Sequence, residues 1–544
     1  MEEKKVIEFK QDDKFFYRIG NQNFLNGNYE CAVKYFLRAV DTSKNKSVIT
    51  RCGYYLVLAQ CYGMLHEFEL SNFYYFRALE CDAFMQMVMR GLGENFFQMG
   101  DDIMSRVYLN KCINFLESSV IAKSAKERLK DFSTKQKFKV VGKDNIDDVI
   151  SSKIDEYMSK GNFEKVIKTL EEKSDFSNAK LRAELSLSYF LVGESEKSVQ
   201  LLEKYGTDTA LDLCNLCLVY NAQGDYENCE KIKLKMRQKE DLTPDEYFKV
   251  GLTFAEVGDL EHAKDFIKKF FELTGAREAE LHFLYGLVCL NKGDTDEAKE
   301  IFIRLKNTHP YSKFLYNFYI ELCSKKDREK VEYIFSVPMH EYLMVQRKLK
   351  SVLTFSPDEL KTFFLQNTDM FYFLAKLGDS NLKSNLFLRL SKIKCDKLNE
   401  FFTYILLTNS AKSSLKCEIL ANRIAYNFSS TISLTKDDFY TKVKTTNMLS
   451  LSLTNKNLFE AVLMSVEYLI SEFFLTTIDL RRIATKIDKV IKSNSQDNPN
   501  VLASFVVWSF VKDKKIVPLS KVCSYFSCSQ EEFYRFIEKY NFDV

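Results

Sequence analysis

The histidines and cysteines are the side chains of this sequence best suited to metal binding or nucleophilic catalysis, and their spacing favours neither. No His-Glu-x-x-His motif occurs, and the five histidines are scattered along the chain: His66, His262, His282, His309 and His340. Cys214 and Cys217 form a single Cys-x-x-Cys pair. A zinc site needs four ligands, and thioredoxin-like chemistry needs a βαβ context that this stretch lacks. We therefore expect no metal site and no reactive cysteine pair.

Two further patterns that could serve an enzyme are incomplete. The stretch Gly91-Leu92-Gly93 resembles the start of a dinucleotide-binding loop, but the third glycine and the preceding strand are missing. The many aspartates and glutamates form no isolated pair that the sequence marks as buried, which is how a catalytic carboxylate pair would be recognised. The sequence thus predicts a protein without catalytic residues, metal or cofactor, and not an enzyme.

Composition and charge narrow the class of protein further. Hydrophobic residues make up 46% and charged residues 28% of the chain, a balance typical of a folded protein rather than a disordered one. A net charge of +3 does not indicate a nucleic-acid partner. The N-terminus lacks the apolar run of a signal peptide, and the most apolar later segment, Leu458 to Leu475, contains three glutamates. We expect a cytoplasmic protein that is not embedded in a membrane.

The elements that would have to position any functional residue are helical hairpins, most clearly repeated between Pro244 and Pro310. Three pairs of small residues recur there, each 35 positions apart: Gly251 and Gly286, Gly258 and Gly293, Ala263 and Ala298. Residues 15–43 follow the same pattern, with Gly20 and Ala32 at the small positions. Because only a small side chain lets two helix backbones approach closely, Gly20, Ala32, Gly251 and Gly286 predict where paired helices cross.

A repeat of about 34 residues with small and large residues at fixed places resembles the tetratricopeptide repeat family. The resemblance implies an all-α, superhelical solenoid in two blocks, followed by a C-terminal helical domain. Five regions are expected along the chain: an N-terminal block of three repeats at 1–120, a basic linker or helix end at 121–145, a second block of about five repeats at 146–310, a helical region similar to HEAT-type repeats at 311–430, and a C-terminal helical domain at 431–544.

The resemblance also implies a binding surface, because the first helix of each hairpin lines the concave face of such a solenoid. In the first block the residues expected to face this groove are Tyr17, Asn21, Phe24, Gln60, Arg90, Glu94 and Phe97. In the second block they include Phe248, Leu252, Phe283, Leu287 and Leu290. The apolar members could instead pack against neighbouring repeats. If they face the groove, the second block offers an apolar trough suited to an amphipathic helix, and the first block a mixed one.

Repeats of this family that clamp the acidic tail of chaperones use a set of lysine, arginine and asparagine residues, and this chain departs from that set. Asn21 matches one asparagine, whereas the other positions hold Tyr17, Val57, Met87 and Gly91. A carboxylate is gripped well by arginine or lysine. We therefore predict a non-enzymatic scaffold or adaptor that binds a protein or peptide segment, with an oligomeric state that the sequence leaves open.

The end of the chain supports an alternative, a transcription-associated regulator. A sharp turn is expected at 527–530, where Ser529 would cap the following helix, and the segment weakly resembles a helix-turn-helix or the last helices of a cyclin-like repeat. The helix after the turn, QEEFYRFIEKY, carries three glutamates against one arginine and one lysine. That balance opposes entry into DNA, where recognition relies mainly on basic and amide side chains.

Overall fold

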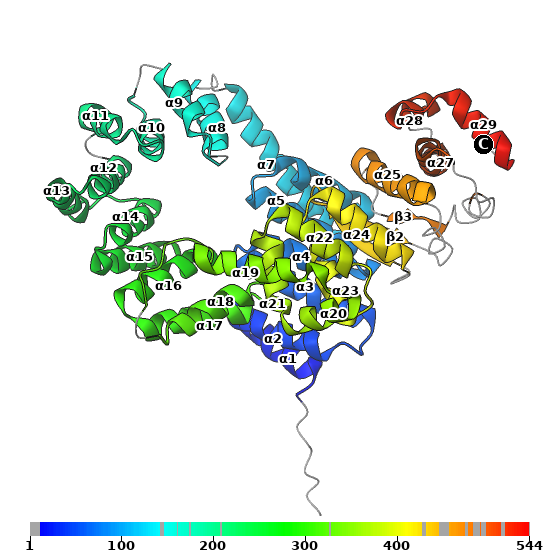
Figure 1. The fold of residues 1–544 in the computed structure, drawn as a ribbon, viewed down its shortest axis with the longest axis horizontal. Coiled ribbons are helices and arrows are strands. Elements are labelled where there is room, and N and C mark those ends of the chain that lie inside the picture. The colour runs from blue at the N-terminus through cyan, green and yellow to red at the C-terminus, as the bar shows by residue number, and fades with distance from the viewer. Residues whose placement is uncertain are drawn as a thin grey trace, which may run out of the picture. The chain divides into compact units, whose positions relative to one another are not determined.

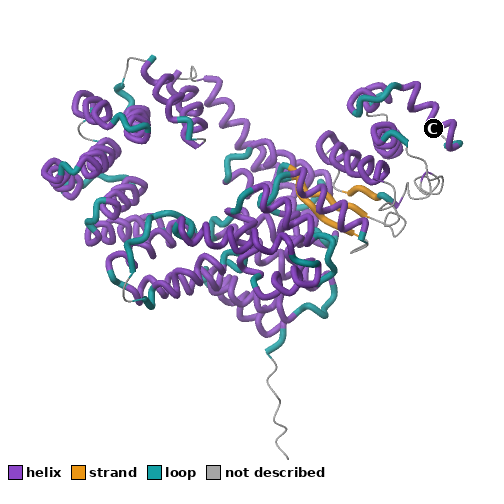
Figure 2. Tube along the Cα trace, in the orientation of Figure 1, coloured by secondary structure: helices purple, strands orange, loops and turns teal. Residues whose placement is uncertain are grey.

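The computed structural model forms two compact units, Met1–Ala125 with Met339–Val544, and Lys126–Pro338. Nearly all ordered elements are helices (Figures 1 and 2). The residues that the structure describes are 11–141, 146–159, 161–172, 176–206, 209–325, 328–426, 431–444, 456–473, 477–481, 490, 497–512 and 517–542.

Helical hairpins build the first quarter of the chain and most of the second unit. The first unit begins with three of them: α1 (Asp13–Leu25) with α2 (Tyr29–Thr42), α3 (Val48–Met64) with α4 (Phe68–Ala78), and α5 (Met85–Gln98) with α6 (Asp102–Phe115), the short η1 (Asp82–Phe84) preceding α5. The second unit contains five: α8 (Ile146–Ser159) with α9 (Phe163–Glu171), α10 (Ala179–Leu191) with α11 (Ser195–Tyr205), α12 (Ala210–Gln223) with α13 (Tyr226–Arg237), α14 (Pro244–Glu256) with α15 (Leu260–Thr274), and α16 (Ala279–Lys292) with α17 (Thr295–Thr308). The helix α18 (Lys313–Leu322) follows the last of these hairpins.

One turn geometry joins the two helices of all eight hairpins. The second or third residue after each first helix donates its backbone amide to the carbonyl five residues back, at 2.8–2.9 Å. Asp259 donates to Phe254 in this way, and Asp294 to Cys289. The residue before this amide has a positive φ, and it is glycine in seven hairpins: Gly27, Gly100, Gly161, Gly193, Gly224, Gly258 and Gly293. Glycine adopts this left-handed conformation at no steric cost, so it ends the first helix and reverses the chain.

The small residues predicted at helix crossings lie at those crossings. A Cβ atom added to Gly20 would come within 2.7 Å of the Phe36 ring, and one added to Gly251 would come within 2.6 Å of Ile267. An added Cβ on Gly286 would lie 2.8 Å from the ring of Phe302. In each case the blocking side chain comes from the second helix of the same hairpin. The prediction of closely paired helices is therefore confirmed.

The turn of the second hairpin is the exception, because His66 occupies the position of the turn glycine with φ 61°. A non-glycine residue in this region costs about 1–2 kcal/mol. We predict that His66→Gly raises the free energy of unfolding of the first hairpin block by about 1 kcal/mol, offset in part by loss of the edge contact between His66 and Phe68. Urea unfolding followed by circular dichroism measures this change.

The matched control for this change is Gly193→Ala, which introduces a Cβ where φ is 88° and no atom lies within 4 Å. The strain then comes from the backbone alone, and the free energy of unfolding should fall by about 1 kcal/mol. A lower stability for His66→Gly than for the wild type would contradict the strain assigned to His66.

The basic stretch predicted as a linker or helix end is helical over its described part. The helix α7 runs from Val120 to Val141, and the boundary between the two compact units falls within it, after Ala125. Residues 142–145, the end of the predicted region 121–145, lie outside the described residues. The division of the chain into five regions stays a prediction.

In the described part of residues 339–542, the regular elements are helices and three short strands. The helices are α19 (Met339–Ser351), η2 (Val352–Thr354), α20 (Pro357–Gln366), α21 (Thr368–Leu377), α22 (Ser380–Leu390), α23 (Asp396–Leu407), α24 (Ser413–Ala425), α25 (Lys456–Phe473), α27 (Pro499–Val511), α28 (Leu519–Tyr525) and α29 (Gln530–Tyr540). Strands β1 (Thr431–Lys436) and β2 (Phe439–Lys444) form an antiparallel hairpin, and β3 (Thr477–Asp479) pairs parallel to β2. This small sheet was not predicted.

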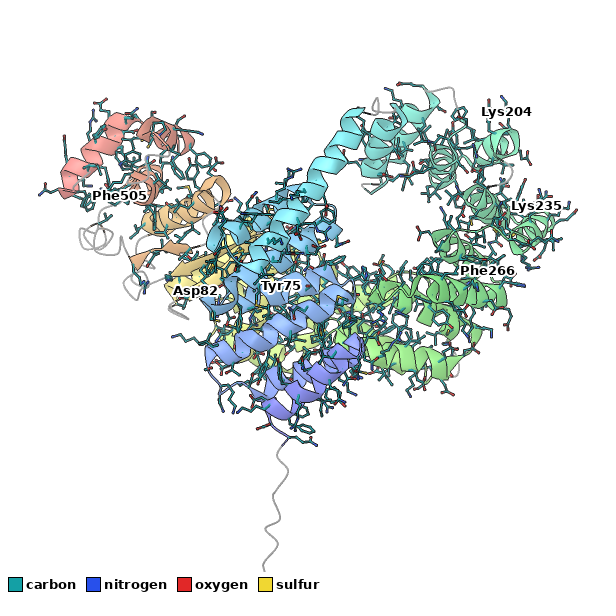
Figure 3. All side chains as sticks on the ribbon, turned by 180° about the vertical axis from the view of Figure 1, so that it is seen from behind. Tyr75, Asp82, Lys204, Lys235, Phe266 and Phe505 are labelled. Atoms are coloured by element: carbon teal, nitrogen blue, oxygen red, sulfur yellow. The ribbon has the colours of Figure 1, made fainter. Side chains whose placement is uncertain are left out.

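The sheet packs on the second helices of the first hairpin block. The Tyr108 hydroxyl on α6 donates to the carbonyl of Asp438 at 2.8 Å and accepts from the amide of Tyr440 at 3.0 Å. The ring of Phe76 on α4 stacks on Tyr440 with centroids 5.7 Å apart. Lys442 forms a 3.1 Å ion pair with Asp82, which Figure 3 labels. Residues more than 300 positions apart in sequence thus share one core.

Candidate functional site

A pocket of about 700 Å³ opens on the first hairpin block, at the first helices of its three hairpins. The residues that line it come from α1, α3 and α5, from the turn at His66, and from the neighbouring helices α4 and α7: Phe24, Gln60, Gly63, Met64, His66, Phe68, Tyr75, Met87, Arg90, Gly91, Glu94, Asn95, Gln98 and Ile121. Tyr75, labelled in Figure 3, lies on α4. The pocket therefore lies where the family resemblance places a binding groove.

Four of the seven groove residues named from the sequence in this block line the pocket: Phe24, Gln60, Arg90 and Glu94. The other three do not. Tyr17 is half-buried between Phe36 and Tyr54, with ring centroids 5.6 and 5.4 Å away, and Asn21 and Phe97 are also half-buried. Whether any of the seven contacts a partner stays a prediction.

The charges in the pocket are paired with each other rather than presented singly. Arg90 forms a 2.9 Å ion pair with Glu94, one turn away on α5, and its Nε donates to the Ser124 hydroxyl at 3.2 Å. Gln98 donates to the second carboxylate oxygen of Glu94 at 3.1 Å. Burial raises the pKa of Tyr75 to about 12 although Arg90 opposes the rise, so this wall of the pocket is neutral at physiological pH. The arrangement suits polar peptide groups better than a free carboxylate.

Apart from Phe24, the family pattern did not identify the apolar side chains of the lining. Met64 and Met87 lie on the first helices of their hairpins and are 49% and 41% exposed. Methionine is flexible and adapts to irregular apolar partners. The spacing of Met64, four residues after Gln60, could have indicated its place because side chains at i and i+4 share one face of a helix.

The residues named for the second block are not an open trough. Phe283, Leu287 and Leu290 on α16 have no exposed surface. The Phe283 ring contacts Tyr319 of α18 and Phe335, with centroids 5.1 and 5.0 Å away. Phe248 and Leu252 on α14 are half-buried. These apolar side chains pack against neighbouring elements of the same unit, which is the alternative that the sequence left open.

His282 has a packing role in the second unit. Its imidazole stacks on Phe271 with centroids 4.4 Å apart and planes 1° from parallel. Burial, together with the charge of Arg304, lowers the pKa of His282 to about 4. The folded protein therefore favours the neutral ring.

We predict a pH dependence of stability from this histidine. Because its folded pKa lies below the ordinary 6.5, its contribution is present above pH 6.5 and is lost as the pH falls towards 4. The second unit should lose roughly 2 kcal/mol between pH 8 and pH 5 through this group. Urea midpoints at the two pH values for the wild type and for His282→Phe test this, and an equal loss in both would assign the effect to other groups.

The cysteine pair shows no sign of reactivity. Cys214 and Cys217 are buried on α12, and burial raises the pKa of Cys214 to about 11. The Cys217 sulfur lies 3.6 Å from that of Cys229 on α13, at a helix crossing where most other hairpins carry Gly, Ala or Ser. Among the described residues no cluster of His, Cys, Asp or Glu could hold a metal ion.

The C-terminal turn has the predicted geometry. Ser527 has φ 53°, and the Ser529 hydroxyl accepts from the amide of Glu532 at 3.1 Å and so caps α29. The exposed face of α29 carries Glu531 in an ion pair with Arg535. The transcription-associated regulator, whose DNA contact the charges of this helix oppose, stays an untested alternative.

These hairpins define an all-α solenoid with the turn and packing rules of a helical repeat. Residues 279–306, which include most of α16 and α17, match the tetratricopeptide repeat family model. The match covers this one hairpin, and the seven other described hairpins use the same turn as the matched one.

No curated protein matches the sequence. Among solved structures, the APC/C hetero-tetramer Cut9–Hcn1 is 11% identical, over 76% of this chain and 90% of that one, with a TM-score of 0.26. Yeast Tom70 is 13% identical, over 95% of this chain and 99% of that one, with a TM-score of 0.20. At such low TM-scores neither likeness bears on function. None of the described helices combines the length and apolar character needed to cross a bilayer.

Proposed function

We propose that the protein is a non-enzymatic interaction adaptor and that the pocket on the first hairpin block holds a segment of a partner protein. The supporting observation is the lining: three consecutive first helices place apolar and amide side chains around one cavity of about 700 Å³. Cavities of this size hold a ligand of several side chains.

The chemistry of the lining indicates the kind of segment. Phe24, Met64 and Met87 offer apolar contact, and the amide of Gln60 has both a donor and an acceptor for a peptide backbone. The Arg90–Glu94 pair satisfies its own charges. The expected partner segment therefore carries one or two apolar anchors flanked by uncharged polar groups.

Affinity purification of the tagged full chain, with quantitative mass spectrometry, tests the adaptor function. Met87→Asp places a charge in the pocket, and Leu25→Asp makes the same change outside it, beside Phe24, at a position 75% exposed. Because interface anchors carry most of the binding energy, partners should be depleted roughly tenfold or more by Met87→Asp and retained by Leu25→Asp. Retention of the same partners by both variants would exclude the pocket.

A further inference from the structure

The described stretch 328–338 has neither helix nor strand, and its backbone is bound by side chains of the second hairpin block. Asn291, near the end of α16, donates its amide to the carbonyl of Val331 at 2.8 Å and accepts from the amide of Val331 at 2.9 Å. One side chain thus satisfies both backbone groups of one residue. The hydroxyl of Tyr319 on α18 donates to the carbonyl of Ser336 at 2.9 Å.

Two basic side chains of this stretch bind near the ends of two consecutive first helices. Arg328 donates to the carbonyl of Leu290 in the last turn of α16 at 2.7 Å. Lys330 donates to the carbonyls of Ala255 and Glu256 at the end of α14, at 3.3 and 3.4 Å. The C-terminal end of a helix carries partial negative charge, so a basic side chain is favourable at both places.

Apolar anchors complete the contact. Phe335 meets Phe283 edge to face, with centroids 5.0 Å apart and planes at 89°, and Val331 and Val337 are buried. Phe283 is one of the three buried α16 residues that the family pattern places on the groove-facing side of the first helix. Lys330 is exposed although its ammonium makes the contacts described above, and Glu329, Glu332 and Ile334 are exposed without a role in them. The stretch therefore contacts the helices through some of its side chains and backbone groups and exposes the rest, as a bound peptide does.

We propose that α14, α16 and α18 form a second peptide-binding site, which the chain closes with its own stretch 328–338. The site would accept from a partner a non-helical segment of the same chemistry: two basic residues separated by one position, an aliphatic residue directly after the second, and a phenylalanine four residues later. This proposal concerns the second unit alone and does not depend on the pocket of the first block.

Release of the stretch need not unfold a helix, because it is held by side-chain hydrogen bonds and three apolar anchors. It ends at Pro338, the last residue of the second unit. A tethered ligand competes at an effective concentration on the order of 1 mM. An outside segment must therefore exceed that concentration or bind more tightly, and the tether sets a threshold for partner binding.

Binding of a fluorescent peptide with the sequence of residues 328–338 to the full chain tests the proposal. Arg328→Ala, Lys330→Ala and Phe335→Ala, combined, should free the site and tighten peptide binding about tenfold or more relative to the wild type. The matched control combines Glu329→Ala, Glu332→Ala and Ile334→Ala and should bind as the wild type does. Adding Asn291→Ala to the freed variant should weaken binding by at least tenfold.

Peptide binding by the freed variant that is no tighter than that of the wild type, or equal binding of a scrambled peptide, would overturn the proposal. If the freed variant loses helical structure, hydrogen exchange on the unmutated chain decides instead. An isotopically heavy peptide at several millimolar should speed exchange of the chain's own residues 328–338, and unchanged exchange would overturn the proposal. Met87→Asp, which alters only the first block, should leave all of these results unchanged.

Discussion

Replacing Asp212 with alanine is expected to lower the free energy of unfolding of the second hairpin block by about 3–5 kcal/mol. Asp212 on α12 has no exposed surface, and Arg182 on α10 holds it through two bonds of 2.6 and 3.2 Å. The Thr209 hydroxyl donates to the same carboxylate at 2.6 Å. Removing the carboxylate leaves the guanidinium buried without a countercharge, which costs far more than the bonds themselves contribute.

The pair joins first helices of successive hairpins, so its loss should act locally in a repeat array. Hydrogen exchange of α10 to α13 and urea unfolding measure the effect. Asp225→Ala, which removes the half-buried N-cap of α13 but no buried ion pair, is the control and should cost about 1 kcal/mol. Replacing both Arg182 and Asp212 with leucine should cost less than Asp212→Ala, because no buried charge is left. Equal losses for Asp212→Ala and Asp225→Ala would refute the role of the pair.

The features that could be predicted from the sequence are those that a single hairpin determines. Gly251 and Gly286 indicated helix crossings because no larger side chain fits between the paired backbones, and the structure places them there. The same repeat spacing indicated which residues of the first helices in the first block face the groove. Four of the seven residues named there, among them Gln60 and Arg90, consequently line one pocket.

Two kinds of feature could not be predicted from the sequence. The first is a segment without a repeating pattern of apolar residues, and the second is a contact between residues far apart in the chain. The stretch 328–338 has no helical pattern, so its contact with Phe283 could not be predicted. The sequence therefore left open whether the apolar face of α16 is exposed or packed. The strands β1 and β2 left a faint signal, alternating apolar residues on either side of Asp437-Asp438. Both aspartates have positive φ, as a tight hairpin turn requires, but such turns usually contain glycine.

The packing of the sheet on the first block leads to the second large effect, which we expect from Tyr108→Ala. Tyr108 is 1% exposed and its ring stacks on Phe96, with centroids 5.5 Å apart and planes at 4°. Truncation opens a cavity and removes both hydrogen bonds to the β1–β2 turn region. The free energy of unfolding should therefore fall by about 3–5 kcal/mol. Tyr108→Phe keeps the ring but removes the partner of the Asp438 carbonyl and the Tyr440 amide. It should lower the free energy of unfolding by about 1–3 kcal/mol.

The location of the loss distinguishes this role from a general packing defect. If Tyr108 anchors the sheet, Tyr108→Ala should increase amide exchange in β1 and β2 more than in α1 to α4, although Tyr108 itself belongs to the first hairpin block. Tyr534→Ala on α29, where the side chain is 48% exposed, should change neither region. Exchange that rises only within α5 and α6 would show that the sheet holds its place without Tyr108. The contact between residues 330 positions apart would then follow from the packing of the first block rather than support it.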